Sequence, residues 1–579
     1  MLWQEPDVIS SGVAPARVNT FTGKDLSMSK IDVHELSDRI ISERSSRRRL
    51  LGRAAALGIS LSAVSGLATH GATFAVAQDA SPVPVPGGTL NVALQADPTT
   101  LDPLKAGLTA IWKVIEHVND GVIRVDPSLA PIPGLAESWE ISEDGTVYTF
   151  HLRSGISFHD GSPFTSDDVL FSWTRILDPA TAAVNAANFL NVKGGAAFLA
   201  GETTELEGIQ APDPQTVVVT LEQPEASFLT ILSTAGSLIF SRAFFDANGG
   251  DTSQTANGTG PFIFKEYVPA TSVSLERNPN YWEAGLPYLD GIEAVIASDD
   301  TARTGALIQG AVDFIEYAPL RDVDMLEETD GLTVAGDELT NIRYLGINLA
   351  REPFGDVRVR QAIAMVIDRT PIIESAVFGH GVGVDTVFAP SFWAGFDREV
   401  PAPDIEGAKA LLAEAGYPDG FETTLITYAP YSFMTNTAII VQEQLSQIGI
   451  RADYTGLEPG TISAQLIARD FDLVVGGSNS WIDPHPVLLS NFKSGQDGNT
   501  TSYSNPEVDA LIDQGGIETD LAARAEIYRQ LQEILLVDLP WVPLFVANQY
   551  EAMKSDVQGY VHYPTASNAS FREVWIAGE

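Results

Sequence analysis

The stretch from Asp404 to Val475 alternates between helix and strand patterns, and this alternation constrains the fold more than any other feature. A capping Asp404 precedes the helical run of residues 408–415, which Gly416 ends. Patterns typical of strand, helix, strand, helix and strand then follow, at residues 423–428, 438–448, 450–454, from 461 onwards and 471–475. Such an order predicts right-handed crossovers and a mainly parallel sheet. We therefore expect an α/β lobe here.

Other elements have equally clear limits. Residues 139–152 read as a hairpin whose turn is Glu143-Asp144-Gly145. Thr165 and Asp168 have capping-box spacing and predict a helix start. A further helix is expected after Asp356, with a buried stripe formed by Val359, Ala362, Ile363, Val366 and Ile367.

Export is indicated by the first part of the chain. Arg47-Arg48-Arg49 precedes a weakly apolar run, residues 54–68, and then the small-x-small pattern Ala75-Val76-Ala77. This order is typical of a signal peptide, and residues 46–51 resemble a twin-arginine motif. We expect cleavage after Ala77, although a retained anchor and a basic amphipathic helix are the alternatives. Met28 is an alternative start to Met1.

Charge and cysteine content exclude several functions. Lys and Arg number 34 against 76 Asp and Glu, a net charge of −42, which opposes binding to nucleic acid or anionic membranes. The chain has no Cys, so thiol catalysis and Cys-ligated metals are impossible. Its eight His lack metal-ligand spacing, and we expect neither a metal nor another cofactor.

Six segments together resemble extracellular solute-binding proteins of family 5, the receptors of ATP-driven (ABC) importers for oligopeptides, dipeptides, nickel complexes and related solutes. They follow the family's order and extend over nearly all of the chain beyond the signal. The segments are residues 135–139, 148–153, 158–169, 258–262 (Gly-Thr-Gly-Pro-Phe), 277–282 (Arg-Asn-Pro-Asn-Tyr-Trp) and 353–362, and the similarity continues at 411–417, 524–528 and 540–544.

The resemblance implies a two-lobed periplasmic-binding-protein fold of α/β class, with hinge strands and an extra domain inserted in the first lobe. The expected divisions are an N-terminal extension with the signal (1–77), a linker (78–88), lobe I (89–125, 224–336 and 546–579), the extra domain (126–223) and lobe II (337–545). It also implies a non-catalytic receptor, expected to be monomeric, that closes over a small-molecule solute and delivers it to membrane permease subunits. A secreted hydrolase is the alternative, but no nucleophile elbow or His-Glu-x-x-His pair supports it. A role as a chemoreceptor partner is also compatible.

Ligand residues are expected where the α/β lobe presents the carboxyl ends of its strands, at residues 428–433 and 476–483. Peptide-binding members of the family anchor the free amine with an Asp four residues before a Pro, and Ser480 occupies that position ahead of Pro484. A hydroxyl cannot neutralise an ammonium, so a free-amine peptide is disfavoured unless Asp483 or Asp97 reaches it, and a neutral polyol or modified peptide fits better. An ordinary loop role for Ser480 is the alternative.

Aromatic and glycine residues complete the candidate set. Aromatic side chains could stack on the solute or belong to the core, and the two glycines could let backbone amides face it. The ligand-binding candidates are Thr109, Trp112, Tyr428, Tyr431, Phe433, Gly476, Ser480, Trp481 and Asp483.

Overall fold

A computed structural model describes residues 83–105, 107, 109–429, 431–478 and 482–578. The chain divides into two compact units, residues 1–81 and 82–579, and the second contains all the described residues. The predicted signal, its twin-arginine motif and the cleavage position after Ala77 lie outside the described residues.

Lobe II is built on strands that the alternating sequence pattern predicts. Its first three strands run parallel in the order β16, β15, β17, and β13 then pairs antiparallel with β17. Helices α11 and α14 supply buried apolar faces to this sheet, as their periodicity predicts. The strands are β13 (Arg343–Ile347), β14 (Gly381–Gly383), β15 (Glu422–Tyr428), β16 (Arg451–Leu457) and β17 (Leu473–Gly477). The helices are α11 (Val357–Val366), α12 (Arg369–Val377), α13 (Ile405–Glu414), α14 (Ser432–Ser446), α15 (Pro459–Ile467), α16 (His485–Phe492), α17 (Pro506–Ile517) and α18 (Leu521–Asp538).

Lobe I contains a second set of strands in the order β11, β1, β10, β9, β8. β1 is parallel to both β10 and β11, whereas β8, β9 and β10 are joined antiparallel. The strands are β1 (Thr89–Leu94), β8 (Phe262–Val268), β9 (Ser272–Arg277), β10 (Gly291–Ile296), β11 (Phe314–Ile315) and β12 (Leu332–Glu338), and the helices are α4 (Thr109–Val118), α8 (Arg242–Ala247), α9 (Asp300–Ile308) and α10 (Val323–Glu327). Two short pairs, β2 (Ile123–Val125) with β3 (Pro131–Pro133) and β19 (Val557–Gln558) with β20 (Trp575–Ile576), lie outside this sheet.

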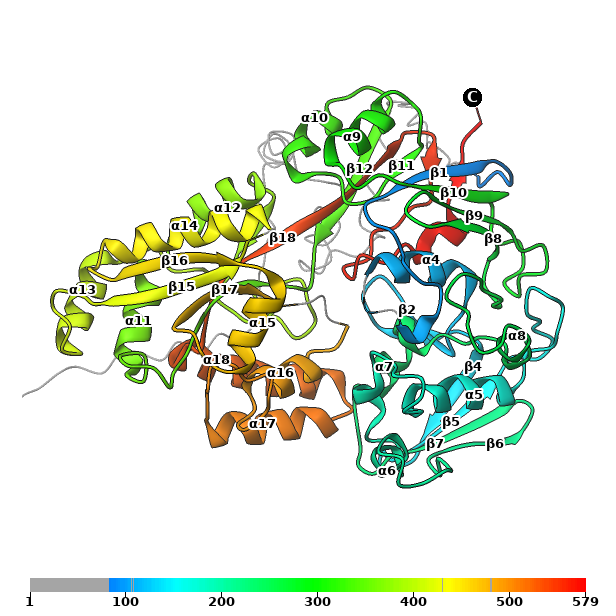
Figure 1. The fold of residues 1–579 in the computed structure, drawn as a ribbon, viewed down its shortest axis with the longest axis horizontal. Coiled ribbons are helices and arrows are strands. Elements are labelled where there is room, and N and C mark those ends of the chain that lie inside the picture. The colour runs from blue at the N-terminus through cyan, green and yellow to red at the C-terminus, as the bar shows by residue number, and fades with distance from the viewer. Residues whose placement is uncertain (1–82, 106, 108, 430, 479–481, 579) are drawn as a thin grey trace, which may run out of the picture. The chain divides into compact units, whose positions relative to one another are not determined.

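One long strand, β18 (Trp541–Lys554), belongs to both lobes (Figure 1). Its first half pairs with β13 and β14, and its second half pairs with β11 and β12. The segment from β12 to β13 makes the second passage between the lobes. These two passages are the hinge strands that the family resemblance implies.

A separate four-stranded antiparallel sheet lies within the span expected for the extra domain (Figure 1). Trp173 of α5 and Phe150 of β5 are both fully buried in its apolar core. Its strands are β4 (Ala136–Ile141), β5 (Val147–Leu152), β6 (Ile209–Asp213) and β7 (Thr216–Thr220), in the order β4, β5, β7, β6, and helices α5 (Ser166–Leu177), α6 (Gly195–Leu199) and α7 (Phe228–Leu232) accompany them. The exact domain limits stay predictions.

The cap signals in the sequence are confirmed. Asp404 accepts a hydrogen bond from the backbone N–H of Gly407 at 2.8 Å, at the start of α13. Thr165 and Asp168 form the capping box at the start of α5. β4 and β5 form the predicted hairpin around Gly145, which has a positive φ of 70°.

Candidate functional site

The carboxyl ends of β15 and β17 meet at one edge of the lobe II sheet, because the two strands are parallel neighbours. β15 ends at Tyr428 and leads through a short connection to α14, which begins at Ser432. β17 ends at Gly477 and leads toward Asp483. In open α/β sheets this is the edge where ligands bind.

Three of the predicted aromatic residues form a continuous run at this edge. The ring centroids of Tyr428 and Tyr431 are 6.3 Å apart, and those of Tyr431 and Phe433 are 5.9 Å apart. Tyr431 remains 46% exposed, whereas the other two rings are half-buried. Burial raises the pKa of Tyr428, and the neighbouring Tyr431 acts in the same direction. The three rings are tilted to one another, by 53° and 37°, and together offer an apolar surface that is still open to contact at Tyr431.

Arg343 completes this edge, although the sequence did not mark it as a candidate. It lies on β13 directly opposite Gly477 of β17, and its guanidinium carbon stands 5.1 Å from the centroid of the Phe433 ring. The pairing of β13 with β18 shifts register between Arg343 and Tyr344. Such irregularities commonly redirect a side chain next to a binding site.

The guanidinium of Arg343 has few protein partners. Its buried Nε has no hydrogen-bond acceptor among the described residues, and Nη1 reaches only the carbonyl oxygen of Ile342, at 3.5 Å. Burial lowers the pKa of Arg343 to about 10, which Tyr344 opposes. In the described part of the chain no carboxylate lies within 4.0 Å of it. Within the described residues, a positive charge therefore lies without a counter-ion at this edge of the sheet.

The two glycines at the end of β17 make room for side chains of β13. A Cβ atom on Gly477 would lie 2.5 Å from Nη1 and 3.0 Å from Cδ of Arg343. A Cβ atom on Gly476 would lie 3.1 Å from the hydroxyl oxygen of Tyr344. Both glycines also pair with β13 in the sheet. The absence of side chains at both glycines therefore leaves room for the side chains of Arg343 and Tyr344.

The remaining candidates fall elsewhere. Ser480 and Trp481 lie outside the described residues. Both carboxylate oxygens of Asp483 accept hydrogen bonds from Arg524, at 2.6 and 2.8 Å. Asp483 also accepts a hydrogen bond from the backbone N–H of His485 at 2.8 Å. Asp97, the other carboxylate considered for an amine, accepts the Tyr267 hydroxyl at 2.9 Å.

Two further candidates belong to lobe I. Thr109 and Trp112 are on α4, where the side chain of Thr109 interacts with the hydroxyl of Tyr317 and Trp112 packs against the apolar cluster of the lobe. The structure thus brings Tyr428, Tyr431 and Phe433 together, places Arg343 against Phe433 and Gly477, and pairs Gly476 with the adjacent Tyr344.

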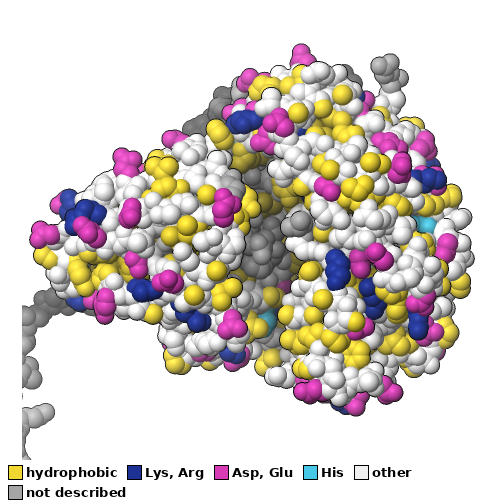
Figure 2. Space-filling model, viewed as in Figure 1, with side chains coloured by type: hydrophobic (Ala, Val, Ile, Leu, Met, Phe, Trp, Pro, Cys, Tyr) yellow, Lys and Arg dark blue, Asp and Glu magenta, His cyan; other side chains and the backbone are white. Residues whose placement is uncertain are grey.

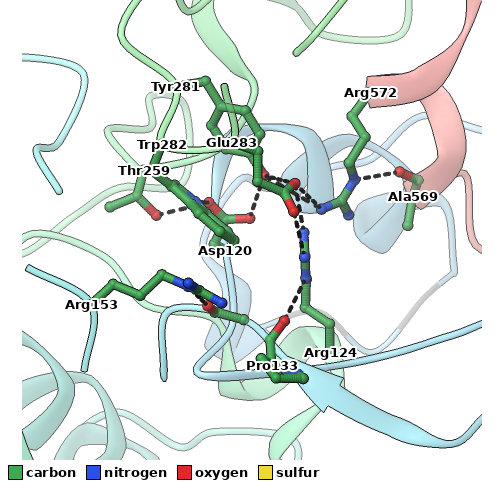
Figure 3. A network of polar contacts seen from close by, with 11 residues as sticks. Asp120, Arg124, Pro133, Arg153, Thr259, Tyr281, Trp282, Glu283, Ala569 and Arg572 are labelled. Atoms are coloured by element: carbon green, nitrogen blue, oxygen red, sulfur yellow. Dashed lines mark hydrogen bonds and ion pairs between the residues drawn. The ribbon is translucent and has the colours of Figure 1, made fainter. Parts of the chain in front are cut away.

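The segments 258–262 and 277–282, which carry part of the family resemblance, contribute to a polar network in lobe I (Figure 3). They do not contribute to the edge of the lobe II sheet described above. Asp120 accepts hydrogen bonds from Thr259 at 3.2 Å, from Tyr281 at 3.2 Å and from Trp282 at 2.8 Å. Glu283 pairs with Arg124 at 2.8 Å. This network joins segments that are far apart in the chain and so stabilises lobe I.

The Trp282 ring is also flanked by cations. The guanidinium carbons of Arg124 and Arg153 lie 5.1 and 4.8 Å from its centroid. Arg153 belongs to the segment that follows β5, so this contact ties the four-stranded sheet to lobe I. Cation–π contacts of this kind contribute modestly to stability.

The surface charge, possible metal ligands and possible membrane spans of the described residues indicate no second site. Figure 2 shows Lys and Arg interspersed with Asp and Glu on the visible face. Among the described residues, no group of three His, Asp or Glu is placed to hold a metal ion, and no helix is both long and apolar enough to cross a membrane.

Comparisons with known proteins agree with this architecture. Residues 130–500 match the family described as bacterial extracellular solute-binding proteins, family 5 Middle. Heme-binding protein A of Haemophilus influenzae is 31% identical over 465 residues, covering 76% of this chain and 83% of the relative. The glutathione-binding protein GsiB of Escherichia coli K12 is 28% identical over 480 residues, covering 81% and 91%.

A solved structure has the same two-lobed fold. The PBP AgaA from A. tumefaciens R10, in complex with agropinic acid, superposes with a TM-score of 0.70 at 30% identity, over 85% of this chain and 99% of AgaA. This match to nearly the whole of AgaA confirms the predicted two-lobed periplasmic-binding-protein fold. The chain belongs to the bacterial extracellular solute-binding proteins of family 5.

Proposed function

We propose that the protein is the solute-capturing receptor of an ABC importer, which closes its lobes over a small solute and delivers it to the membrane permease. The observation that carries this proposal is the edge of the lobe II sheet next to β13. There the aromatic run from Tyr428 to Phe433 lies beside the guanidinium of Arg343, which has no carboxylate partner among the described residues. Closure would exclude water from these groups and strengthen their polar contacts with the solute.

Only two chain passages link the lobes, and this supports a hinge. β18 and the segment between β12 and β13 make these passages, so rotation there needs few backbone changes. Away from the hinge, the backbone N–H of Ala226 donates to the carbonyl of Gly516 at 2.8 Å. This bond joins the segments assigned to lobe I and lobe II, and solute binding would act on such contacts.

The solute we propose is small and is either a peptide or peptide-like molecule or a neutral sugar or polyol, bound without a free ammonium at the position of Ser480. The ligands for which these relatives are named or with which they were solved, heme, glutathione and agropinic acid, differ among themselves. They support a small solute without selecting one. Thr109, Trp112, Ser480, Trp481 and Asp483 stay proposed ligand residues.

Export through a twin-arginine signal, with cleavage after Ala77, belongs to the same proposal. The mature protein would then act as a monomer in the periplasmic space or at the outer face of the cell membrane. N-terminal sequencing of the exported protein tests this: a first residue of Gln78 supports the proposed cleavage, and an intact N-terminus contradicts it.

Native mass spectrometry of the freshly purified protein tests the receptor function. We expect a bound small molecule that denaturation releases, and that raises the unfolding temperature when it is added back. A broad panel of peptide and polysaccharide substrates provides the opposing test. Turnover of any of them would support the hydrolase alternative.

A further inference from the structure

Arg343 is exceptional among the cations of this chain. Most described Lys and Arg side chains lie within 4.0 Å of a carboxylate. Besides Arg343, five described cations have no carboxylate at that distance. Each of these five donates to a backbone carbonyl oxygen by a hydrogen bond shorter than 3.5 Å: Lys105, Arg153, Arg360, Arg369 and Arg469. Among the described Lys and Arg side chains, Arg343 alone has neither a carboxylate within 4.0 Å nor a hydrogen bond shorter than 3.5 Å.

This isolation is unexpected in so acidic a protein. Acidic residues exceed basic ones by 42, yet none of the described carboxylates lies beside this guanidinium. A largely buried cation with no counter-ion and one distant hydrogen-bond acceptor is destabilising. The absence of a side chain at Gly477 leaves room for the guanidinium there, and the register of β13 against β18 shifts at the same residue. Such an arrangement is explained if the missing anion arrives with the solute.

The surroundings of Arg343 favour a solute that carries an anionic group next to a flat or apolar group. The planar guanidinium matches a carboxylate, to which it can donate two parallel hydrogen bonds. Helix α14 begins beside Phe433 and has no side-chain cap at Tyr431, so the positive end of its dipole adds to the charge of Arg343. The aromatic run from Tyr428 to Phe433 lies next to the cation and provides an apolar wall.

We propose that Arg343 binds a carboxylate of the solute, whose flat or apolar part lies against Tyr431 and Phe433. The proposal rests on the receptor function and narrows the solute to an organic acid, such as a peptide-like acid or a sugar acid. A neutral sugar or polyol would leave the guanidinium without its counter-ion when the lobes close.

The test uses the full chain and two pools of small molecules. A small-molecule extract of the host cell is separated by anion exchange into an anionic and a neutral pool, and each is added to the protein while thermal unfolding is followed. The variants are Arg343→Gln and Arg343→Lys. Arg451→Gln is the matched control, because it removes one positive charge from the same lobe at an exposed ion pair.

We expect the anionic pool to stabilise the wild type and Arg451→Gln. Arg343→Gln should need a roughly 30-fold or higher concentration for the same stabilisation, as is typical when one partner of a buried charge pair is lost. Arg343→Lys, which keeps the charge but loses the two-pronged donor, should fall between them. Circular dichroism confirms that each variant is folded.

Each other outcome has a distinct meaning. An anionic pool that stabilises Arg343→Gln as well as it stabilises the wild type overturns the proposed anchor, and so does stabilisation of the wild type by the neutral pool alone. Both results leave the receptor function standing. If neither pool stabilises the wild type and no molecule co-purifies, the receptor function itself fails, and the anchor fails with it.

Discussion

Asp483 and Arg524 form a two-pronged ion pair in the interior of lobe II, with hydrogen bonds of 2.6 and 2.8 Å and side chains only 5% and 4% exposed. Arg524 also donates to the carbonyl of Gly515 at 2.7 Å. Gly516, the next residue, accepts the bond from Ala226 that joins segments of the two lobes. This ion pair therefore supports the part of lobe II that reaches lobe I.

Removing one partner of this pair should destabilise the protein. Asp483→Asn leaves Arg524 buried without its counter-ion, and we expect the free energy of unfolding to fall by about 3 kcal/mol. Urea unfolding followed by tryptophan fluorescence measures the change. Glu406→Gln is the control, because the exposed pair of Glu406 with Lys409 contributes little. A loss of solute affinity at unchanged stability would instead support the ligand role proposed for Asp483 and contradict the structural role.

Adding a methyl group at Gly477 should weaken solute binding. The Cβ atom of Gly477→Ala would overlap Nη1 of Arg343, and the flexible guanidinium would move away from its place over Phe433. We expect a loss of affinity of about tenfold or more, measured by calorimetric titration with the co-purified solute. Gly460→Ala is the matched control, because no atom lies within 4 Å of its added methyl group. Equal affinities of the two variants would contradict this prediction.

The polar network around Asp120 should affect stability without affecting the solute. Asp120→Asn puts an amide group where one carboxylate accepts bonds from Thr259, Tyr281 and Trp282. We expect a loss of about 1–3 kcal/mol in the free energy of unfolding, because buried donors lose an acceptor. Solute affinity at a temperature well below unfolding should stay at the wild-type value. A reduced affinity would place this network in the ligand site.

Acid should destabilise the protein partly through His117. Burial lowers the pKa of His117 to about 3, and the nearby Arg572 and Lys113 act in the same direction. In the unfolded chain the pKa is about 6.5, so the unfolded state binds more protons and stability falls as the pH decreases from 6.5 toward 3. The contribution of the neutral ring is fully present above pH 6.5.

His117→Phe removes this titration while keeping a ring that can stack on Phe571. Between pH 6 and 4 the stability of the variant should fall less steeply than that of the wild type, by up to about 1.4 kcal/mol per pH unit. Urea unfolding at several pH values gives the two slopes. Parallel slopes would show that His117 does not contribute.

Introducing a carboxylate at position 480 should change the preferred solute. Ser480→Asp supplies the negative charge that peptide-binding relatives are expected to use for a free amine. We expect it to improve the binding of di- and tripeptides with a free amine relative to their N-acetylated forms, measured by thermal shift. Unchanged or weaker binding of the free-amine peptides would count against the role assigned to this position.

Local signals in the sequence were sufficient for much of the fold. Asp404 and Gly416 mark the limits of α13, and the positions of Val359 and Ile363 reveal the buried face of α11. These features depend on residues that are close in the chain. The loop position of Tyr428 and Tyr431 was equally predictable, because the ends of parallel strands meet at one edge.

Arg343 could not be predicted in the same way. It precedes Gly477 by more than a hundred residues, and only antiparallel pairing of β13 with β17, together with the register shift against β18, places it over Phe433. The adjacent Gly476 and Gly477 were the available signal. They indicated a close approach at the strand end but did not show that a side chain from β13 makes it.

Neither lobe can complete its sheet until late in synthesis, because β18 is an inner strand in both lobes. The pairing of its first half with β13 and β14, and of its second half with β11 and β12, must wait until residues 541–554 have left the ribosome. A chain that stops before Trp541 would expose unpaired strand edges in both halves at once, and such edges promote aggregation. Truncated products should therefore be removed by proteolysis or precipitate, leaving no functional single lobe.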